Sequence, residues 1–246
     1  SEADKGDATR CLAAVLLLWL AGGDDGKART LPERNPEPVA ASRITDVVDG
    51  DTVVLETGAE VRLTGIQAPK LPLGRPGFRE WPLAREALAA MRDIALGKAA
   101  TLDYPGAKFD RWGRLLAHVR VQGSRDDEVW LQQEMLRRGL ARVYTFRDNR
   151  AHADELYAAE TEARKARRGI WALDWYRILA PGDTERRIGT FQIVEGAPVD
   201  VAIVRGTAYL NFGTDWRTDF TASVASENMK LFRRARVDVT KLEGRK

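Results

Sequence analysis

The sequence predicts a mainly β fold with added helices, in which short strands close into a small barrel and a second, smaller β-rich unit follows. The prediction depends on the order of the expected elements. Between residues 42 and 173 the order is three strands, a helix, two strands and two more helices. This is the order of an OB-fold barrel carrying three helices. From residue 189 another series of strands ends in a helix.

The barrel strands are expected where β-type residues lie between turn signals: 43–48, 52–56, 60–66, 100–104 and 114–121. Asp49-Gly50 separates the first two, as in a tight hairpin. A proline-rich loop precedes Pro82, which suits the first position of a helix that ends at Gly97. Two further helices, 128–138 and 152–168, are each followed by a glycine in the C-cap position, Gly139 and Gly169.

The second unit is expected over residues 189–246, after a linker at 174–188. Its strands are expected at 191–204, 207–212 and 219–224, with a helix at 226–235. Our hypothesis is that it is a second OB-like module that is cut short. Its closely spaced aromatic residues suit either the core of a small barrel or a platform for oligonucleotides: Tyr209, Phe212, Trp216 and Phe220.

The composition is that of a globular protein, with 44% hydrophobic and 30% charged residues among 246. The net charge of +3 permits an anionic partner without requiring one. A single cysteine, Cys11, excludes an intramolecular disulfide. The two histidines, His118 and His152, are too few for a histidine-rich metal site, so a metal would need oxygen ligands.

The N-terminal region contains an apolar run, Cys11–Ala21, preceded by Lys5 and Arg10. It is shorter than the about 20 residues that span a bilayer, so no integral membrane span is expected. Its length suits the core of a signal peptide, which predicts a signal-like segment at 1–23 and export to the periplasm or the medium. The alternative is a short buried helix. Residues 24–41, which contain three prolines, are expected to be a linker.

Four motifs in the barrel region occur in a specific order: Asp49-Gly50-Asp51-Thr52, the segment R-L-T-G-I-Q-A-P at 62–69, Asp110-Arg111-Trp112-Gly113-Arg114, and Gly169-Ile170-Trp171. Each motif is weak evidence when taken alone. Together they resemble the staphylococcal-nuclease-like (thermonuclease) family, over roughly residues 42–173. The resemblance implies an OB-fold barrel that binds DNA or RNA and hydrolyses phosphodiester bonds with Ca²⁺.

The resemblance also implies roles for individual residues. Asp51 falls on the first calcium ligand, and Thr52 supplies the neighbouring carbonyl ligand. Arg62 and Arg114 fall on the two arginines that bind phosphate, where bidentate geometry favours arginine over lysine. A metal held by carboxylates would polarise the phosphate and activate water.

Two positions depart from the family pattern, which usually reads G-I-D-A-P-E where this chain has Gly65-Ile66-Gln67-Ala68-Pro69-Lys70. Gln67 replaces the second calcium carboxylate, so calcium affinity should be weakened. Lys70 replaces the glutamate that activates water and, being positively charged near neutral pH, cannot act as a base. Lys70 is either a third phosphate contact or an ordinary surface charge. Glu80 is the best candidate for a replacement base.

The expected substrate groove has further support in the sequence. Arg111 and Trp112 would flank the nucleotide, and Tyr144 and Phe146 lie near positions where the family stacks a base. Three functions stay open at this point: a nuclease with an altered site, a nucleic-acid-binding relative that has lost hydrolysis, and a structural or assembly module. The sequence identifies no protein partner.

Overall fold

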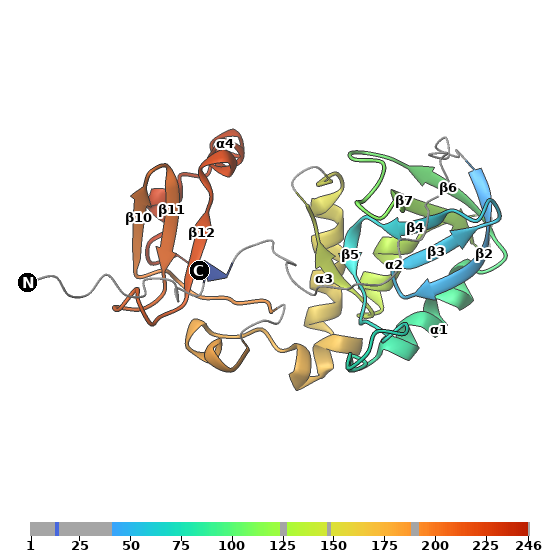
Figure 1. Ribbon diagram of the computed structural model, residues 1–246, viewed down its shortest axis with the longest axis horizontal. Helices are drawn as coiled ribbons and strands as arrows, with labels where there is room; N and C mark the ends of the chain where they lie inside the picture. Colours follow the sequence, from blue (N-terminus) through green and yellow to red (C-terminus); the bar gives the residue numbers. More distant parts are fainter. Residues whose placement is uncertain (1–12, 15–40, 124–126, 147–148, 188–191, 246) are drawn as a thin grey trace, which may run out of the picture. The chain divides into compact units, whose positions relative to one another are not determined.

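A computed structural model of the protein describes residues 13–14, 41–123, 127–146, 149–187 and 192–245 (Figure 1). These residues fall into two compact units, with the boundary between Tyr176 and Arg177. Most of the predicted signal-like segment and of the linker at 24–41 lies outside the described residues. The two units are therefore treated separately.

The first unit is a closed five-stranded barrel, which confirms the predicted fold class. Its sheet has the order β4-β3-β2-β6-β7-β8, and β4 also pairs with β7 in parallel, so that the first five of these strands close on themselves. The other neighbouring strands are antiparallel. The strands are β2 (Ala41–Asp49), β3 (Thr52–Leu55), β4 (Glu60–Leu63), β6 (Ala99–Asp103), β7 (Leu115–Gln122) and β8 (Glu128–Trp130).

The expected single strand at 60–66 is divided in the structure. β4 ends at Leu63, and β5 (Gly65–Gln67) leaves the barrel to pair with β9 (Arg142–Tyr144), a strand that the sequence did not predict. The break falls at Gly65, whose φ of 86° is strained for other residues. A Cβ atom at this position would also lie 2.5 Å from Leu156 Cδ1.

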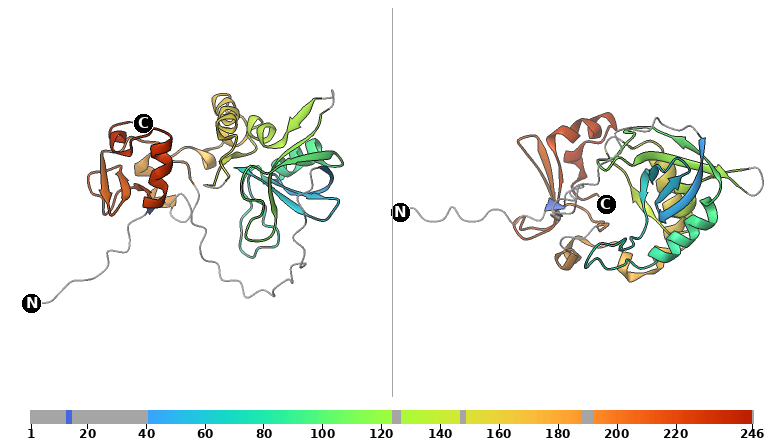
Figure 2. Two further views of the ribbon diagram at one scale, coloured as in Figure 1. Left: turned by 90° about the horizontal axis from the view of Figure 1, so that it is seen from above. Right: turned by 45° about the vertical axis from the view of Figure 1, so that its right-hand side comes forward.

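Three helices cover the barrel: α1 (Ala84–Ala95), α2 (Leu131–Arg137) and α3 (Ala153–Lys165). The predicted start of the second helix at Glu128 was wrong, because residues 128–130 pair with β7 as β8. Helix α1 packs on β2 and α2, and α3 packs on α2 and β9 (Figure 2). The turn between β2 and β3 is buried, and its Gly50 packs against Ala87 of α1.

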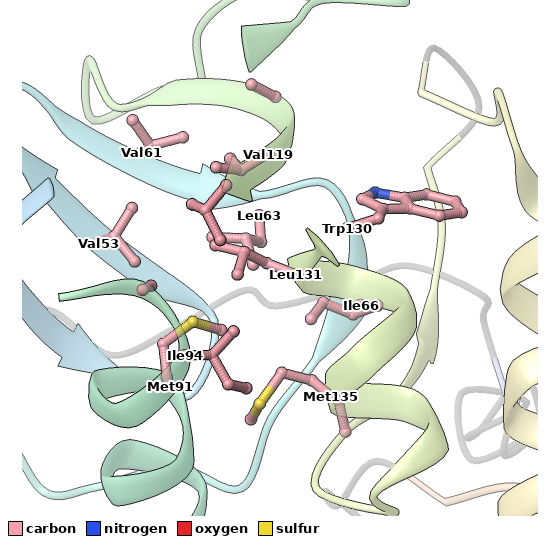
Figure 3. Close-up of a cluster of buried hydrophobic side chains, with 14 of the residues drawn as sticks. Val53, Val61, Leu63, Ile66, Met91, Ile94, Val119, Trp130, Leu131 and Met135 are labelled. Carbon is pink, nitrogen blue, oxygen red and sulfur yellow. The ribbon is translucent and has the colours of Figure 1, made fainter. Parts of the chain in front are cut away.

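The core of this unit lies between the barrel strands and helices α1 and α2. Figure 3 shows Met135 of α2 projecting toward Met91 and Ile94 of α1, with barrel residues such as Val53 and Leu63 in the same cluster. All five side chains are at most 5% exposed. Burying a side chain of this size stabilises a fold by about 1.5–3 kcal/mol.

Two contacts between distant segments fix the end of the unit. Gly139 and Gly169, which close the second and third predicted helices, lie against each other, and Ile170 N donates to Gly139 O at 2.8 Å. A Cβ on either glycine would overlap the backbone of the other segment. Beyond them, the buried Tyr176 donates its hydroxyl to Pro82 O at 2.7 Å, which joins the end of the unit to the segment before α1.

The second unit contains a small sheet in the order β1-β12-β11-β10. Strands β10 (Asp200–Val204), β11 (Thr207–Asn211) and β12 (Thr221–Val224) form an antiparallel meander, and β1 (Ala13–Ala14) pairs with β12 in parallel. Helix α4 (Met229–Arg234) follows. The predicted strand at 191–204 begins only at Asp200, after Pro198, which cannot donate to a ladder. The proposed likeness to an OB barrel stays a prediction.

Across the described residues, no helix has both the length and the apolar character needed to cross a bilayer. Export through the N-terminal segment stays a prediction.

Candidate functional site

The site begins at the tight turn between β2 and β3. Gly50 is packed so closely that a Cβ atom there would lie 2.7 Å from the Cβ atoms of Ala68 and Ala87. The turn is further fixed because Asp49 Oδ1 accepts a hydrogen bond of 3.0 Å from Asp51 N. The two carboxylates on either side of Gly50 are consequently held inside the protein, with Asp49 4% and Asp51 0% exposed.

Asp51 is the centre of a network of charged side chains. Its Oδ2 atom accepts from Ala68 N at 2.7 Å, and both carboxylate oxygens lie 2.7 Å from Lys70 Nζ. Arg62 Nε lies 3.3 Å from Oδ1. Burial alone would raise the pKa of Asp51, but the positive charges of Arg62 and Lys70 outweigh it and hold the pKa below its ordinary value. Asp51 is therefore a permanently charged partner for these two cations.

Lys70 connects the two aspartates of the turn. Its Nζ atom also lies 3.1 Å from Asp49 Oδ2. Burial and the neighbouring charge of Asp51 raise the pKa of Asp49, whereas Lys70 acts in the opposite direction. The ammonium group has three N–H donors, and it makes contacts with three carboxylate oxygens. A phosphate contact by Lys70, one of its two predicted roles, would therefore compete with the aspartates.

Arg62 lies on β4, opposite Thr52 of β3. Its guanidinium donates to Leu63 O and Ile66 O, each at 2.6 Å, and to Asp51 O at 3.3 Å. The side chain is 14% exposed. These contacts hold the guanidinium in one orientation at the point where β4 ends and β5 begins.

Arg114 is positioned by the turn that precedes β7. Asp110 Oδ1 accepts from Trp112 N at 2.9 Å and from Arg114 N at 3.0 Å, while Asp110 Oδ2 accepts from Arg114 Nε at 2.7 Å. The side chain of Arg114 is 28% exposed, and its Nε atom makes this ion pair.

The two arginines are carried by neighbouring segments of the barrel sheet. In the parallel pair β4–β7, Arg62 is opposite Leu116, and Arg114 immediately precedes Leu115, the first residue of β7. Val61 and Leu115 are buried in the core. Because successive side chains of a strand point to opposite faces, Arg62 points away from the core, where it contacts Asp51. Arg114 lies in the turn at the start of the neighbouring strand, where Asp110 holds it.

Gln67 is engaged by Arg142. Its Oε1 atom accepts from Arg142 Nε at 3.2 Å and from Arg142 Nη2 at 2.9 Å. Arg142 is buried, which lowers its pKa to about 10. The amide oxygen that was expected to face calcium is therefore engaged by a buried guanidinium.

Glu80, the candidate replacement base, lies in the loop before α1. Its carboxylate oxygens accept from Arg85 Nε at 3.0 and 3.1 Å. The structure places it in an ion pair with an exposed arginine, outside the network around Asp51.

Exposed aromatic side chains lie near the arginines. Trp112 is 54% exposed and carries the guanidinium of Arg111 over its ring, at 4.1 Å from the centroid. Tyr144 pairs through its backbone with Gly65 of β5, and its ring lies 4.9 Å from that of Phe146, which is 39% exposed. The β4–β5 segment that holds Arg62 therefore has aromatic side chains next to it.

Three features of the site were not predicted from the sequence. Asp49, which the sequence places in a tight turn, is part of the ion network. Arg142 binds the Gln67 side chain. The two histidines, which are far apart in the sequence, have rings 5.0 Å apart, and His118 is almost fully buried. Of these three features, only the role of Asp49 could have been inferred from the sequence, because Asp49 and Asp51 flank Gly50 in an Asp-x-Asp spacing.

The residues around Asp51 do not fit a calcium ion. Calcium takes six to eight oxygen ligands at about 2.3–2.6 Å. Here Lys70 Nζ occupies the bidentate position on Asp51, and Gln67 is held by Arg142. In the described part of the chain, no group of three or more His, Cys, Asp and Glu residues could hold a metal ion.

The fold defines a small barrel protein that carries two positioned arginines, Arg62 and Arg114. The family model described as Staphylococcal nuclease homologue matches residues 60–173. The thermonuclease of Staphylococcus hyicus is 26% identical over 172 residues, which cover 65% of this chain and 93% of that protein. Endonuclease YncB of Bacillus subtilis (strain 168) is 28% identical over 155 residues, covering 61% and 70%. Residues 60–173, most of the barrel domain, are therefore those of a staphylococcal-nuclease-like protein.

In the second unit, the aromatic residues divide into two groups. Phe212 and Phe220 pack together with ring centroids 5.3 Å apart, as core residues do. Trp216 is 53% and Tyr209 37% exposed, and the Arg217 guanidinium lies 4.9 Å from the Trp216 ring. A role of these aromatics in binding oligonucleotides stays a prediction.

Proposed function

We propose that the barrel domain binds single-stranded DNA or RNA, with Arg62 and Arg114 on the phosphodiester backbone and bases stacked on neighbouring aromatic side chains. The observation that carries this proposal is that two arginines in preset orientations lie on neighbouring segments of the barrel, Arg62 on β4 and Arg114 directly before its parallel partner β7. Membership of a nuclease-like family supports nucleic acid as the ligand.

Phosphate recognition depends on orientation as well as charge. Arg62 is fixed by Leu63 O and Ile66 O, and Arg114 is fixed by Asp110. Because their orientations are set before the ligand arrives, little side-chain freedom is lost on binding. Trp112 and Phe146 offer exposed rings, and stacking on such rings contributes about 1–3 kcal/mol per base without reading sequence.

Hydrolysis of the bound strand is the second candidate function. It is favoured by the thermonuclease and the endonuclease among the relatives, and by the presence of both arginines. In this chain hydrolysis would have to proceed without calcium on Asp51, since the Lys70 ammonium is bonded there. It would also need a base other than Glu80, whose carboxylate is paired with Arg85. We therefore propose nucleic-acid binding as the first function of the domain and cleavage as the second.

The test uses the full chain and a fluorescently labelled single-stranded oligonucleotide, as DNA and as RNA. Anisotropy is measured over a range of salt concentrations for the wild type and for Arg114→Ala. Loss of one phosphate contact should weaken binding by roughly tenfold and reduce the slope of log K against log salt by about 0.7. A wild type that does not bind at low salt would overturn the proposal.

Arg138→Ala is the matched control. Arg138 forms an i,i+4 ion pair with Glu134 at 2.7 Å, the same spacing and distance as the pair of Arg114 with Asp110, but it lies at the C-terminal end of α2. It should leave the affinity and the salt slope unchanged. The same samples are incubated with calcium and then with EGTA and run on a gel. Cleavage that requires calcium and is lost in Arg62→Ala would establish the hydrolytic function instead.

A further inference from the structure

The Lys70 ammonium lies in a cage of carboxylate oxygens inside the barrel domain. Asp51 contributes Oδ1 and Oδ2, each 2.7 Å from Nζ, and Asp49 contributes Oδ2 at 3.1 Å. The side chains of Lys70, Asp49 and Asp51 are 19%, 5% and 0% exposed. This arrangement is an enclosed cation site whose cation is covalently part of the chain.

A divalent ion and this ammonium exclude each other. A hard cation that bound both oxygens of Asp51 would lie about 2.3–2.6 Å from each. Nζ already lies at nearly that position, equidistant from the same two atoms. Binding an ion there would require the Lys70 side chain to leave, which would separate it from both aspartates.

The charge of the cluster leads to the same conclusion. Asp49 and Asp51 bring two negative charges, and Lys70 and Arg62 bring two positive ones, so the four side chains sum to zero. Sites for hard divalent cations depend on an excess of negative ligand charge. The neutral amide of Gln67 does not supply one, and its oxygen already accepts from Arg142.

The cluster also connects segments that are distant in the sequence. Asp51 follows the β2–β3 turn, Lys70 follows β5, and Ala68 N donates to Asp51 Oδ2 at 2.7 Å. The ammonium therefore holds the turn to the segment after β5, as a metal ion would by bridging carboxylates.

We propose that Lys70 is a built-in cation that permanently replaces a divalent metal ion in the barrel domain, so that this chain keeps its Asp49–Asp51 turn in place without calcium. Replacing the ammonium by a neutral group turns the cage into an open site for a hard divalent cation. The proposal concerns metal binding and stability, and it holds whether or not the domain binds nucleic acid.

Thermal unfolding of the full chain tests this, with each protein melted in EGTA and in millimolar calcium chloride. The wild type should have the same Tm in both. Lys70→Met keeps the length of the side chain and removes the charge, so its Tm in EGTA should fall by roughly 10 °C because two buried carboxylates lose their partner. Calcium should recover part of that loss, since a ligand of the folded state stabilises it.

Lys70→Glu should show the larger calcium effect, because it puts a third carboxylate in the cage. Arg92→Met is the control: it breaks the exposed ion pair of Arg92 with Asp46 at 3.3 Å and should not create a calcium response. Calorimetric titration of calcium into the wild type is the second measurement, and it does not depend on the variants folding. Saturable binding at low millimolar calcium, or a wild-type Tm that rises with calcium, would overturn the proposal. So would a Lys70→Met variant that folds but gains nothing from calcium.

Discussion

Lys70 Nζ is equidistant, at 2.7 Å, from the two carboxylate oxygens of Asp51, a residue that lies 19 positions earlier in the chain. The contact is mostly buried and is extended by Asp49 on one side and by Arg62 on the other. The centre of the site is therefore an ion cluster in which two carboxylates and two cationic side chains balance.

The first prediction concerns the stability that Asp51 provides. Asp51→Asn leaves Lys70 and Arg62 without their buried partner, so the free energy of unfolding should fall by about 3–5 kcal/mol. Asp46→Asn removes a carboxylate from an exposed pair with Arg92 and should cost no more than about 1 kcal/mol. Urea denaturation followed by circular dichroism measures both. Similar losses in the two variants would contradict the central role of Asp51.

The second prediction concerns the different contributions of Arg62 and Arg114 to stability and to binding. Arg62→Lys cannot reproduce the contacts with Leu63 O, Ile66 O and Asp51 at once, because an ammonium lacks the planar fork of donors. It should lose about 1–3 kcal/mol of stability as well as affinity for oligonucleotide. Arg114→Lys should lose affinity with little change in stability. Denaturation and anisotropy on the same preparations distinguish the two, and equal stability losses would argue against this division.

The third prediction concerns base stacking. Trp112→Ala should weaken binding of a single-stranded oligonucleotide by about 1–3 kcal/mol, because one exposed ring is lost. Its effect on stability should stay within about 0.5 kcal/mol, as is usual for exposed positions. Tyr157→Ala removes an aromatic ring of similar exposure from α3, 52% against 54%, and should leave binding unchanged. If both variants bind as tightly as the wild type, the stacking face lies elsewhere.

The fourth prediction concerns pH. Burial, together with His152 and Arg120, outweighs Asp103 and Glu155 and lowers the pKa of His118 from 6.5 to about 4. Its ring nitrogens have no hydrogen-bond partner among the described residues. Below pH 6.5 the unfolded chain binds a proton here more readily than the folded one, so stability should fall as the pH falls. The loss should reach about 3 kcal/mol near pH 4.

His118→Phe tests the origin of that pH dependence. Phenylalanine fits a buried position beside the ring of Trp130, 5.3 Å away, and has no proton to take up. Unfolding free energies of this variant should decline less between pH 6.5 and 4 than those of the wild type. An equally steep decline in the variant would assign the effect to other groups.

The strand and helix order could be predicted because turn signals such as Asp49-Gly50 and the glycines after the helices are local. The sequence showed that Lys70 departs from the family pattern. It did not predict that the Lys70 side chain contacts Asp49 and Asp51, because these carboxylates come close to Lys70 only when the barrel closes. Strand β9 was missed because three residues carry no periodic pattern. Its pairing with β5 depends on Gly65. Only the folded structure shows that Leu156 lies so close to Gly65 that a Cβ atom would not fit there.

The hydrogen bond from Tyr176 to the carbonyl of Pro82 sets a practical limit on how this protein can be divided. A fragment that stopped at residue 173, the end of the matched family region, would lack the tyrosine that anchors the entry to α1. The carbonyl would then face water, and the surface that Tyr176 covers would become accessible to proteases. A gene fragment meant to yield a self-standing barrel should therefore extend to residue 176 at least.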